Sequence, residues 1–415
     1  MDKEETMISE KDRTILRQVA ARKRDMATSA ENDRIMALWR AQAAGRRDTP
    51  PVRLLFSNFT REVIEPRMQC EGELARSLEW RLLDSLVGRE LFGDDTPLSD
   101  RFEIPLMAGV DPFGTAPDLT RVKNSSGFHI NPVTNDIEKD FALFTKGSHF
   151  CDPEGTQALA DAANEAFGDI LPARIVMHNL AGAITNPLVM LIGMQNYYMA
   201  MYDAPETLHK IMELATEQYL AHFDDLEQRG LLLPTNGFSP LQQESFAFTD
   251  ELPADRVTKT TELWGFLESQ ETTAVAPKTY GEFVYPYQDR LVRRFGLLSY
   301  GCCERVDDLW EDYLSKWTNL RKLSVSPFND EPRVGQYLAG TRVVYYSKPR
   351  AELVTMPGPM DEEAVRDCFR AIGQAASGCL LEVAQREVGT IYGDFSRGRR
   401  YVQLAREALA ESWKP

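Results

Sequence analysis

Polar residues at the ends of short apolar segments are the clearest chemical signal in this 415-residue sequence. In the run YGCCE, alternation along a strand would place Tyr300, Cys302 and Glu304 on one face and Cys303 on the other. A phenol, a thiol and a carboxyl group that converge in this way could bind Zn²⁺ or move a proton. The two cysteines could equally be small buried apolar residues or form a vicinal disulfide, and spacing does not decide which of them faces a cleft.

Several other predicted strands also end in polar residues. We predict catalytic roles for Tyr300, Glu304 and Glu268, and metal ligation by Cys302, Cys303 and Glu271. The predicted substrate-binding residues are Gln270, Asn236, His178, His129, Ser326 and Glu387. Lys348 follows another apolar run, and a Schiff-base role there would require a lowered pKa that the sequence does not show.

The elements that must position these residues alternate between apolar runs and amphipathic stretches. Strands are predicted at 52–56, 102–108, 173–178, 231–236, 263–268, 296–302, 320–326, 342–347 and 380–388. Helices are predicted at 205–229, 278–294, 306–316, 332–338, 361–376 and 397–411. Because strand and helix alternate and no glycine-rich phosphate motif follows the first strand, the pattern favours an α/β fold of the closed (β/α)8 TIM-barrel type.

Two segments depart from this alternation. Residues 1–48 are rich in charged residues and alanine with spaced apolar positions, which predicts a helical extension before a body at 49–415. Residues 111–147 are rich in Gly, Pro, Asn and Asp, which predicts an insertion that is either a lid over the site or a surface decoration.

Charge and composition narrow the class of protein. With 47 Lys and Arg against 63 Asp and Glu, the net charge is −16, which argues against nucleic acid and anionic membranes as partners. The apolar run 188–194 is too short to span a bilayer, and the charged opening residues are unlike a secretory signal. Six cysteines in a chain of this length do not indicate a disulfide scaffold. We therefore expect a cytoplasmic enzyme.

Several longer motifs make the chain similar to a known superfamily. They are WGFLESQE at 264–271, YPYQDRLVRRFG at 285–296 leading into YGCCERVDDLW, and LRKLSVSPFND at 320–330. With the order of elements, they resemble the uroporphyrinogen decarboxylase superfamily over about 52–411, in particular its branch of cobalamin-dependent methyltransferases. This resemblance implies a (β/α)8 barrel, often dimeric, that binds zinc through Cys and His or Glu and exchanges a methyl group with a separate corrinoid protein.

The resemblance transfers only part of the metal site. The family's His-x-Cys strand matches Tyr300-Gly301-Cys302, so the cysteine is present and the histidine is not. Where members place a Cys or His at the last strand, this chain has residues 387–389. Cys302, with Glu268 or Glu304, is therefore what the resemblance offers as zinc ligands.

Three functions follow from these observations. The leading prediction is methyl transfer from a small methylated donor, such as a methyl ether, to a corrinoid protein, by a homodimer. The second is a metal-free decarboxylase or lyase that acts on a small carboxylic acid. The third is a non-catalytic binding protein on a barrel scaffold. Decarboxylation of a tetrapyrrole is not expected, because the region of the first strand has only Arg53 and Arg61 where such enzymes have an arginine-rich motif.

Overall fold

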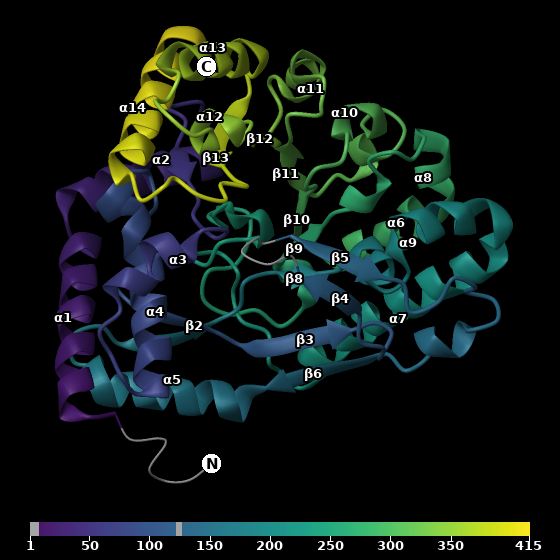
Figure 1. Cartoon of the computed structure of the whole chain (residues 1–415), viewed down its shortest axis with the longest axis horizontal. Coiled ribbons are helices and arrows are strands. Elements are labelled where there is room, and N and C mark those ends of the chain that lie inside the picture. The colour runs from purple at the N-terminus through teal and green to yellow at the C-terminus, as the bar shows by residue number, and fades with distance from the viewer. Residues whose placement is uncertain (1–7, 122–126) are drawn as a thin grey trace.

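The core of the protein is a seven-stranded parallel sheet surrounded by helices (Figure 1). The computed structural model describes residues 8–121 and 127–415. Along the sheet the order is β1 (Val52–Leu54), β13 (Leu380–Gln385), β12 (Val344–Ser347), β11 (Leu320–Val325), β10 (Leu297–Tyr300), β9 (Trp264–Leu267) and β8 (Leu180–Ala181). The α/β class with a parallel sheet, predicted from the alternating pattern, is therefore confirmed.

The strands of this sheet are apolar over most of their length because helices or other segments cover them. All six residues of β13 are buried, as are all four of β10 and of β12. Continuous burial of this kind is typical of parallel sheets, whose crossover helices pack on the faces of the sheet. The register places Val344 beside Leu380, and Leu297 beside Trp264.

Helices connect the strands. In chain order they are α1 (Glu10–Ala27), α2 (Ala30–Ala43), α3 (Thr60–Val63), α4 (Glu73–Val87), α5 (Pro153–Phe167), α6 (Thr185–Asp203), α7 (Pro205–Gln228), α8 (Pro277–Phe283), α9 (Tyr285–Val292), α10 (Val306–Leu309), α11 (Glu331–Leu338), α12 (Glu352–Thr355), α13 (Glu362–Ala375) and α14 (Phe395–Ser412). The helix predicted at 278–294 is divided into α8 and α9, because Pro286 lacks an N–H group and cannot continue the preceding helix. No helix in the described ranges is long and apolar enough to cross a membrane.

A closed ring of strands is not found among the described residues. The remaining parallel pair, β2 (Phe102–Pro105) with β7 (Ala173–Val176), has no hydrogen-bonded ladder to the seven-stranded sheet. The strand predicted at 231–236 is wrong, since this stretch forms no ladder. Pro234 within it has no N–H group to donate, and the Thr235 side chain, not its backbone, accepts from Trp264 N at 2.9 Å.

The loop that follows this stretch is held by side chains of the sheet. Lys322 Nζ of β11 donates to Ser245 Oγ at 2.5 Å and pairs with Glu382 Oε1 of β13 at 2.7 Å. Tyr346 of β12 donates to the carbonyl oxygen of Gln243 at 2.5 Å. Glu382 of β13 in turn accepts from Ser245 Oγ at 2.5 Å, so three neighbouring strands hold this loop against the sheet.

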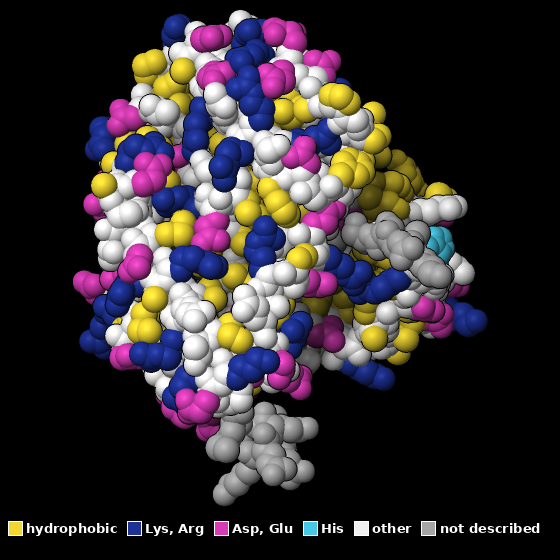
Figure 2. Space-filling model, turned by 60° about the vertical axis from the view of Figure 1, so that its left-hand side comes forward, with side chains coloured by type: hydrophobic (Ala, Val, Ile, Leu, Met, Phe, Trp, Pro, Cys, Tyr) yellow, Lys and Arg dark blue, Asp and Glu magenta, His cyan; other side chains and the backbone are white. Residues whose placement is uncertain are grey.

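The first two helices pack on the body of the protein. Helix α1 is N-capped by Ser9 and contacts α4 and α5, and α2 is N-capped by Ser29. In Figure 1 these helices lie on the same side of the molecule as α14, near the other end of the chain. On the face shown in Figure 2, basic and acidic side chains are interspersed rather than gathered in one area.

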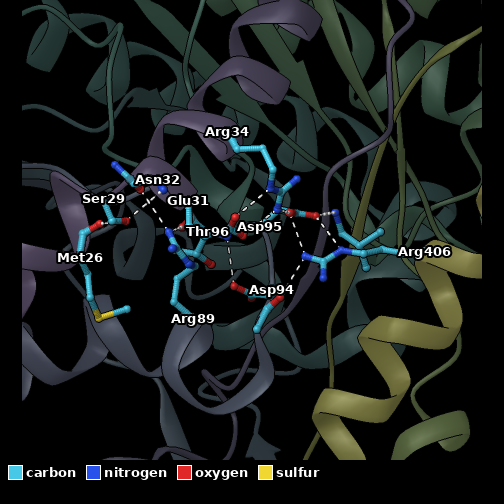
Figure 3. Close-up of polar contacts among 12 residues, drawn as sticks. Met26, Ser29, Glu31, Asn32, Arg34, Arg89, Asp94, Asp95, Thr96 and Arg406 are labelled. Atoms are coloured by element: carbon cyan, nitrogen blue, oxygen red, sulfur yellow. Dashed lines mark hydrogen bonds and ion pairs between the residues drawn. The ribbon is translucent and has the colours of Figure 1, made fainter.

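A buried aspartate fastens α2, β1 and α14 to one another (Figure 3). Asp95 pairs with Arg34 Nη2 of α2 at 3.3 Å and with Arg406 Nη2 of α14 at 2.8 Å. Its second carboxylate oxygen accepts from Val52 N of β1 at 2.9 Å, and its carbonyl oxygen accepts from Trp39 Nε1 at 2.8 Å. All the polar atoms of Asp95 that face the interior are therefore bonded.

The segment predicted as an insertion, 111–147, contains antiparallel strands. Strand β3 (Met107–Asp111) pairs with β6 (Ser148–Asp152), and between them β4 (Asp118–Arg121) pairs with β5 (Phe128–Asn131). Residues 122–126 of this prediction lie outside the described residues. The stretch after β5 rests on α6, where Val133 N donates to Leu191 O at 2.8 Å.

Candidate functional site

The YGCCE run does not continue as a regular strand. Strand β10 ends at Tyr300, and Gly301 has a φ of +103°, a conformation that a residue with a Cβ rarely adopts. The chain then bends through Cys302, Cys303 and Glu304. The prediction that strand alternation aligns Tyr300, Cys302 and Glu304 is therefore wrong, because the alternation stops at Gly301.

Tyr300 lies in the core between the sheet and α8. Its hydroxyl is 2.9 Å from Ser269 Oγ and 3.2 Å from the hydroxyl of Tyr280, and its ring packs edge-on against Trp317. Burial raises the pKa of Tyr300 well above its ordinary value. These contacts enclose the phenol. The hydroxyl of Tyr300 therefore has no access to a cavity, which the predicted catalytic role would require.

Glu304 connects the ends of β9 and β10. One carboxylate oxygen accepts from Ser269 N at 2.8 Å and the other from Cys302 N at 2.7 Å. Burial raises the pKa of Glu304, and these two backbone donors oppose the rise. With both oxygens engaged, Glu304 holds the bend in place rather than facing a cavity.

The two glutamates after β9 also have fixed partners. Glu268 accepts from Gln270 N at 2.8 Å, and burial together with the charge of Glu271 raises the pKa of Glu268 well above its ordinary value. Glu271 accepts from Thr185 Oγ1 at 2.6 Å and from Asn186 Nδ2 at 2.8 Å. Both of these donors belong to α6, so Glu271 is directed to that helix and not to the cysteines.

The two adjacent thiols are near each other and have unequal acidity. Cys302 Sγ is 3.7 Å from Cys303 Sγ and 3.2 Å from Gln270 Oε1. The hydrogen bond with Cys302 and the charge of Lys348 lower the pKa of Cys303 to about 7. The same contact between the thiols, together with burial, raises the pKa of Cys302. Cys303 is therefore the thiol that ionises near neutral pH.

A cavity of about 400 Å³ opens at the carboxyl ends of β10 to β13. Its polar lining includes Cys303, Ser326, Lys348, Arg350, Arg386 and Glu387. The carboxyl ends of parallel strands are where α/β proteins commonly bind their substrates. Three basic side chains line this cavity against two acidic ones, Glu352 and Glu387, and this positive balance favours an anionic ligand.

Lys348 and Arg386 share one protein acceptor. Lys348 Nζ donates to Gln243 Oε1 at 3.1 Å and to Cys302 O at 2.6 Å, and Arg386 Nη1 also donates to Gln243 Oε1. The Nε atom of Arg386 is buried and has no hydrogen-bond partner. Burial lowers the pKa of Lys348. A lowered pKa is what a Schiff-base role for this lysine would require, and the sequence did not show it. These cations therefore retain hydrogen-bonding capacity that a bound anion could use.

Backbone strain is concentrated beside this cavity. Gln243, Glu244 and Glu387 have φ values of 65°, 67° and 57°, in the left-handed region that non-glycine residues seldom adopt. Such conformations cost about 1–3 kcal/mol each and persist where surrounding contacts enforce them, often at functional sites. Here Tyr346 and the two cations hold Gln243 in place.

The structure brings together only some of the predicted site residues. Cys303, Ser326 and Glu387 line the cavity, and Cys302 and Gln270 lie next to it. Asn236 donates to Thr249 O at 2.6 Å and stabilises a loop, and His129 lies on β5. His178, 3.1 Å from Pro240 O, lines other cavities.

Arg386 has a central position in this cavity but had no predicted role, and Lys348 was considered only for a Schiff base. Arg386 lies inside the range predicted as a strand, and it directly follows β13 as Lys348 directly follows β12. The strand-end rule that selected Ser326 also pointed to Lys348, and it could have found Arg386 in the same way. Gln243 gave no such signal, because its position depends on a loop that is distant in the sequence.

The donor atoms expected for zinc do not converge. Within the described ranges, no group of three or more His, Cys, Asp or Glu side chains is placed to hold a metal ion. The oxygens of Glu304 and Glu271 accept from other donors, as does one oxygen of Glu268, and no described side chain joins Cys302 and Cys303 as a third ligand. The arrangement therefore does not fit a zinc site, and we derive no chemistry from one.

The fold and the site together define an α/β protein with a cationic cavity at the carboxyl ends of its parallel strands. No family model matches the chain, and no curated protein matches it. A methyltransferase from Methanosarcina mazei is a similar solved structure, with a TM-score of 0.51 and 12% identity over 91% of this chain and 99% of that one. At this identity the likeness shows the fold, and membership of the superfamily named above stays a prediction.

Proposed function

We propose that this protein is an enzyme, a methyltransferase, that removes the methyl group from a small anionic donor at the strand-end cavity and passes it to a corrinoid carried by a separate protein. The observation that carries the proposal is the pair Lys348 and Arg386, whose donors are only partly used by the protein. The fold shared with a methyltransferase is consistent with it. An anionic donor would be oriented by these cations.

The chemistry requires stabilisation of the group that loses the methyl carbon. When the bond between that carbon and its oxygen breaks, the electron pair would stay on the oxygen, and the reduced corrinoid of the partner would supply the nucleophile that accepts the methyl group. Lys348 Nζ has three N–H donors and two protein acceptors, so one donor remains for the leaving oxygen. Because burial lowers its pKa, Lys348 is also a better proton donor than an ordinary lysine.

A second candidate uses the same cavity. A decarboxylase would bind a small carboxylic acid through these cations, release CO2 and return a proton from Lys348 to the remaining carbanion. The observation that favours this candidate is the failure of the described side chains to gather three zinc ligands.

One assay separates the two candidates. The purified protein is incubated with free reduced corrinoid and a panel of small methoxy acids, and the absorbance change from Co(I) to methyl-Co(III) is followed. Methyl transfer predicts conversion that depends on enzyme and donor. CO2 release from small acids without corrinoid methylation would favour the decarboxylase. If neither reaction is observed, both candidate functions are excluded. A homodimer in the cytoplasm stays a prediction.

A further inference from the structure

A second cavity, of about 280 Å³, lies between the first helices and the sheet. Its charged lining comes from separate elements: Lys23 from α1, Arg53 from β1, Arg81 and Asp84 from α4, and Glu103 from β2. None of these residues lines the strand-end cavity. The second cavity is therefore a separate place in the fold.

Lys23 is the unusual member of this lining. Its side chain is only 5% exposed, yet it makes no hydrogen bond or ion pair with any residue that the structure describes. A buried ammonium group without a partner is costly, and proteins normally pair such groups. Burial lowers the pKa of Lys23 to about 8, so it remains largely protonated at neutral pH.

The neighbouring carboxyl groups do not compensate for this charge. Glu103 and Asp84 act on Lys23 electrostatically, but neither forms an ion pair with it. Asp84 is an exposed residue that lines the cavity, where desolvation raises its pKa to about 6, and burial raises the pKa of Glu103. Both shifts show that the surroundings disfavour the negative forms of these acids.

Two arginines add positive charge. Arg53 donates to Thr96 Oγ1 at 3.1 Å and stacks on the ring of Phe246. Arg81 makes no ion pair within the described part of the chain. With three basic groups facing two weakened acids, the cavity has a positive balance at neutral pH.

The remaining lining is mostly apolar and includes four aromatic residues, beside polar ones such as Ser99, His178 and Ser239. Trp80 and Phe102 contribute to one part of the lining, and Phe238 and Phe246 to another. Aromatic walls suit an apolar body, whereas the two carboxyl groups would repel a dianion such as phosphate. The lining as a whole therefore favours a monoanion with an apolar part.

We propose that this cavity binds a small organic carboxylate, with the carboxylate group against Lys23 and the apolar part against the aromatic walls. The ligand supplies the counter-charge that the protein does not. The proposal does not depend on methyl transfer, because it involves other residues in another cavity.

The test is calorimetric titration of the whole protein with benzoate, and with benzyl alcohol as a neutral analogue. Benzoate should bind and benzyl alcohol should not. The variant Lys23→Met should weaken the binding of benzoate by about tenfold or more, because the charged partner is removed. Lys11→Met is the matched control, since Lys11 lies on the same helix and is exposed, and this variant should bind as the wild type does.

Lys348→Met distinguishes this cavity from the one at the strand ends and should leave the binding event at Lys23 intact. If Lys23→Met does not fold, Glu103→Gln provides the second variant, and it should tighten the binding of benzoate because a repelling carboxyl group is removed. Benzoate binding that is absent in the wild type, unchanged in Lys23→Met or Glu103→Gln, or abolished by Lys348→Met would overturn the proposal.

Discussion

Two charged regions of this molecule are built in opposite ways. Both carboxylate oxygens of Asp95 are bonded: the two arginines that pair with it are seen in Figure 3, and the N–H of Val52 donates to its second oxygen. At the strand ends, Lys348 and Arg386 share Gln243 as an acceptor, and Arg386 Nε has no partner.

This difference separates structural from functional charge. A network in which the protein satisfies every group needs nothing further and fastens elements to one another. A network that leaves buried donors unsatisfied, next to strained backbone and a cavity, is the arrangement expected of a binding site. The predictions below ask whether changes at the first region affect stability and changes at the second affect activity.

The largest effect is expected at the strand-end cavity. Lys348→Met should lower the rate of methyl transfer by about 10²-fold or more, because the leaving group loses its charged donor. The melting temperature should change little, since the methionine side chain can fill most of the same volume. Activity assays with thermal unfolding of the same samples check this. Lys316→Met, at an exposed lysine, is the control and should keep full activity.

The reverse pattern is expected at the aspartate. Asp95→Ala should lower the free energy of unfolding by about 2–4 kcal/mol, because Arg34, Arg406 and the N–H of Val52 lose their acceptor. Urea unfolding measures this change. Asp25→Ala removes an exposed aspartate and should cost less than about 0.5 kcal/mol. Equal stability of the two variants would remove the contrast between the regions.

A smaller effect should show that Tyr300 contributes to stability and not to activity. Tyr300→Phe deletes the hydroxyl that contacts Ser269 and Tyr280, and should cost about 1 kcal/mol of unfolding free energy. Activity should remain close to that of the wild type, because the phenol is enclosed in the core. A large loss of activity with unchanged stability would instead return Tyr300 to the catalytic role that the sequence suggested.

The mildest change concerns the acidity of Cys303. Alkylation by iodoacetamide should become half-maximal near pH 7, because the thiolate is the reactive form and the pKa of Cys303 is lowered to about 7. Below that pH the thiol is protonated and labelling slows. Cys368, whose pKa burial raises to about 11, should label slowly over the same range. Mass spectrometry of the labelled peptides checks both residues, and a midpoint near pH 9 for Cys303 would contradict the account.

The sequence predicted the second half of the fold well because strand and helix alternate there without interruption. Strands β10 to β13 lie within the predicted ranges, and Cys303, Ser326 and Glu387, which follow three of these strands, line the cavity. The predicted alignment of Tyr300 with Glu304 on one strand face is wrong because one glycine with positive φ ends the alternation. Gln243 could not be predicted, since a loop joins it to the strand ends only through tertiary contacts.

The most direct measurement compares an anionic donor with its neutral analogue. Methyl transfer to reduced corrinoid is followed with a methoxy acid and with the matching amide, in the wild type and in Lys348→Met. We predict that the wild type prefers the acid by about 10²-fold in kcat/KM and that the variant loses most of this preference. Equal rates for the acid and the amide in the wild type, or an unchanged preference in the variant, would contradict the assignment of the strand-end cavity as the site of an anionic methyl donor.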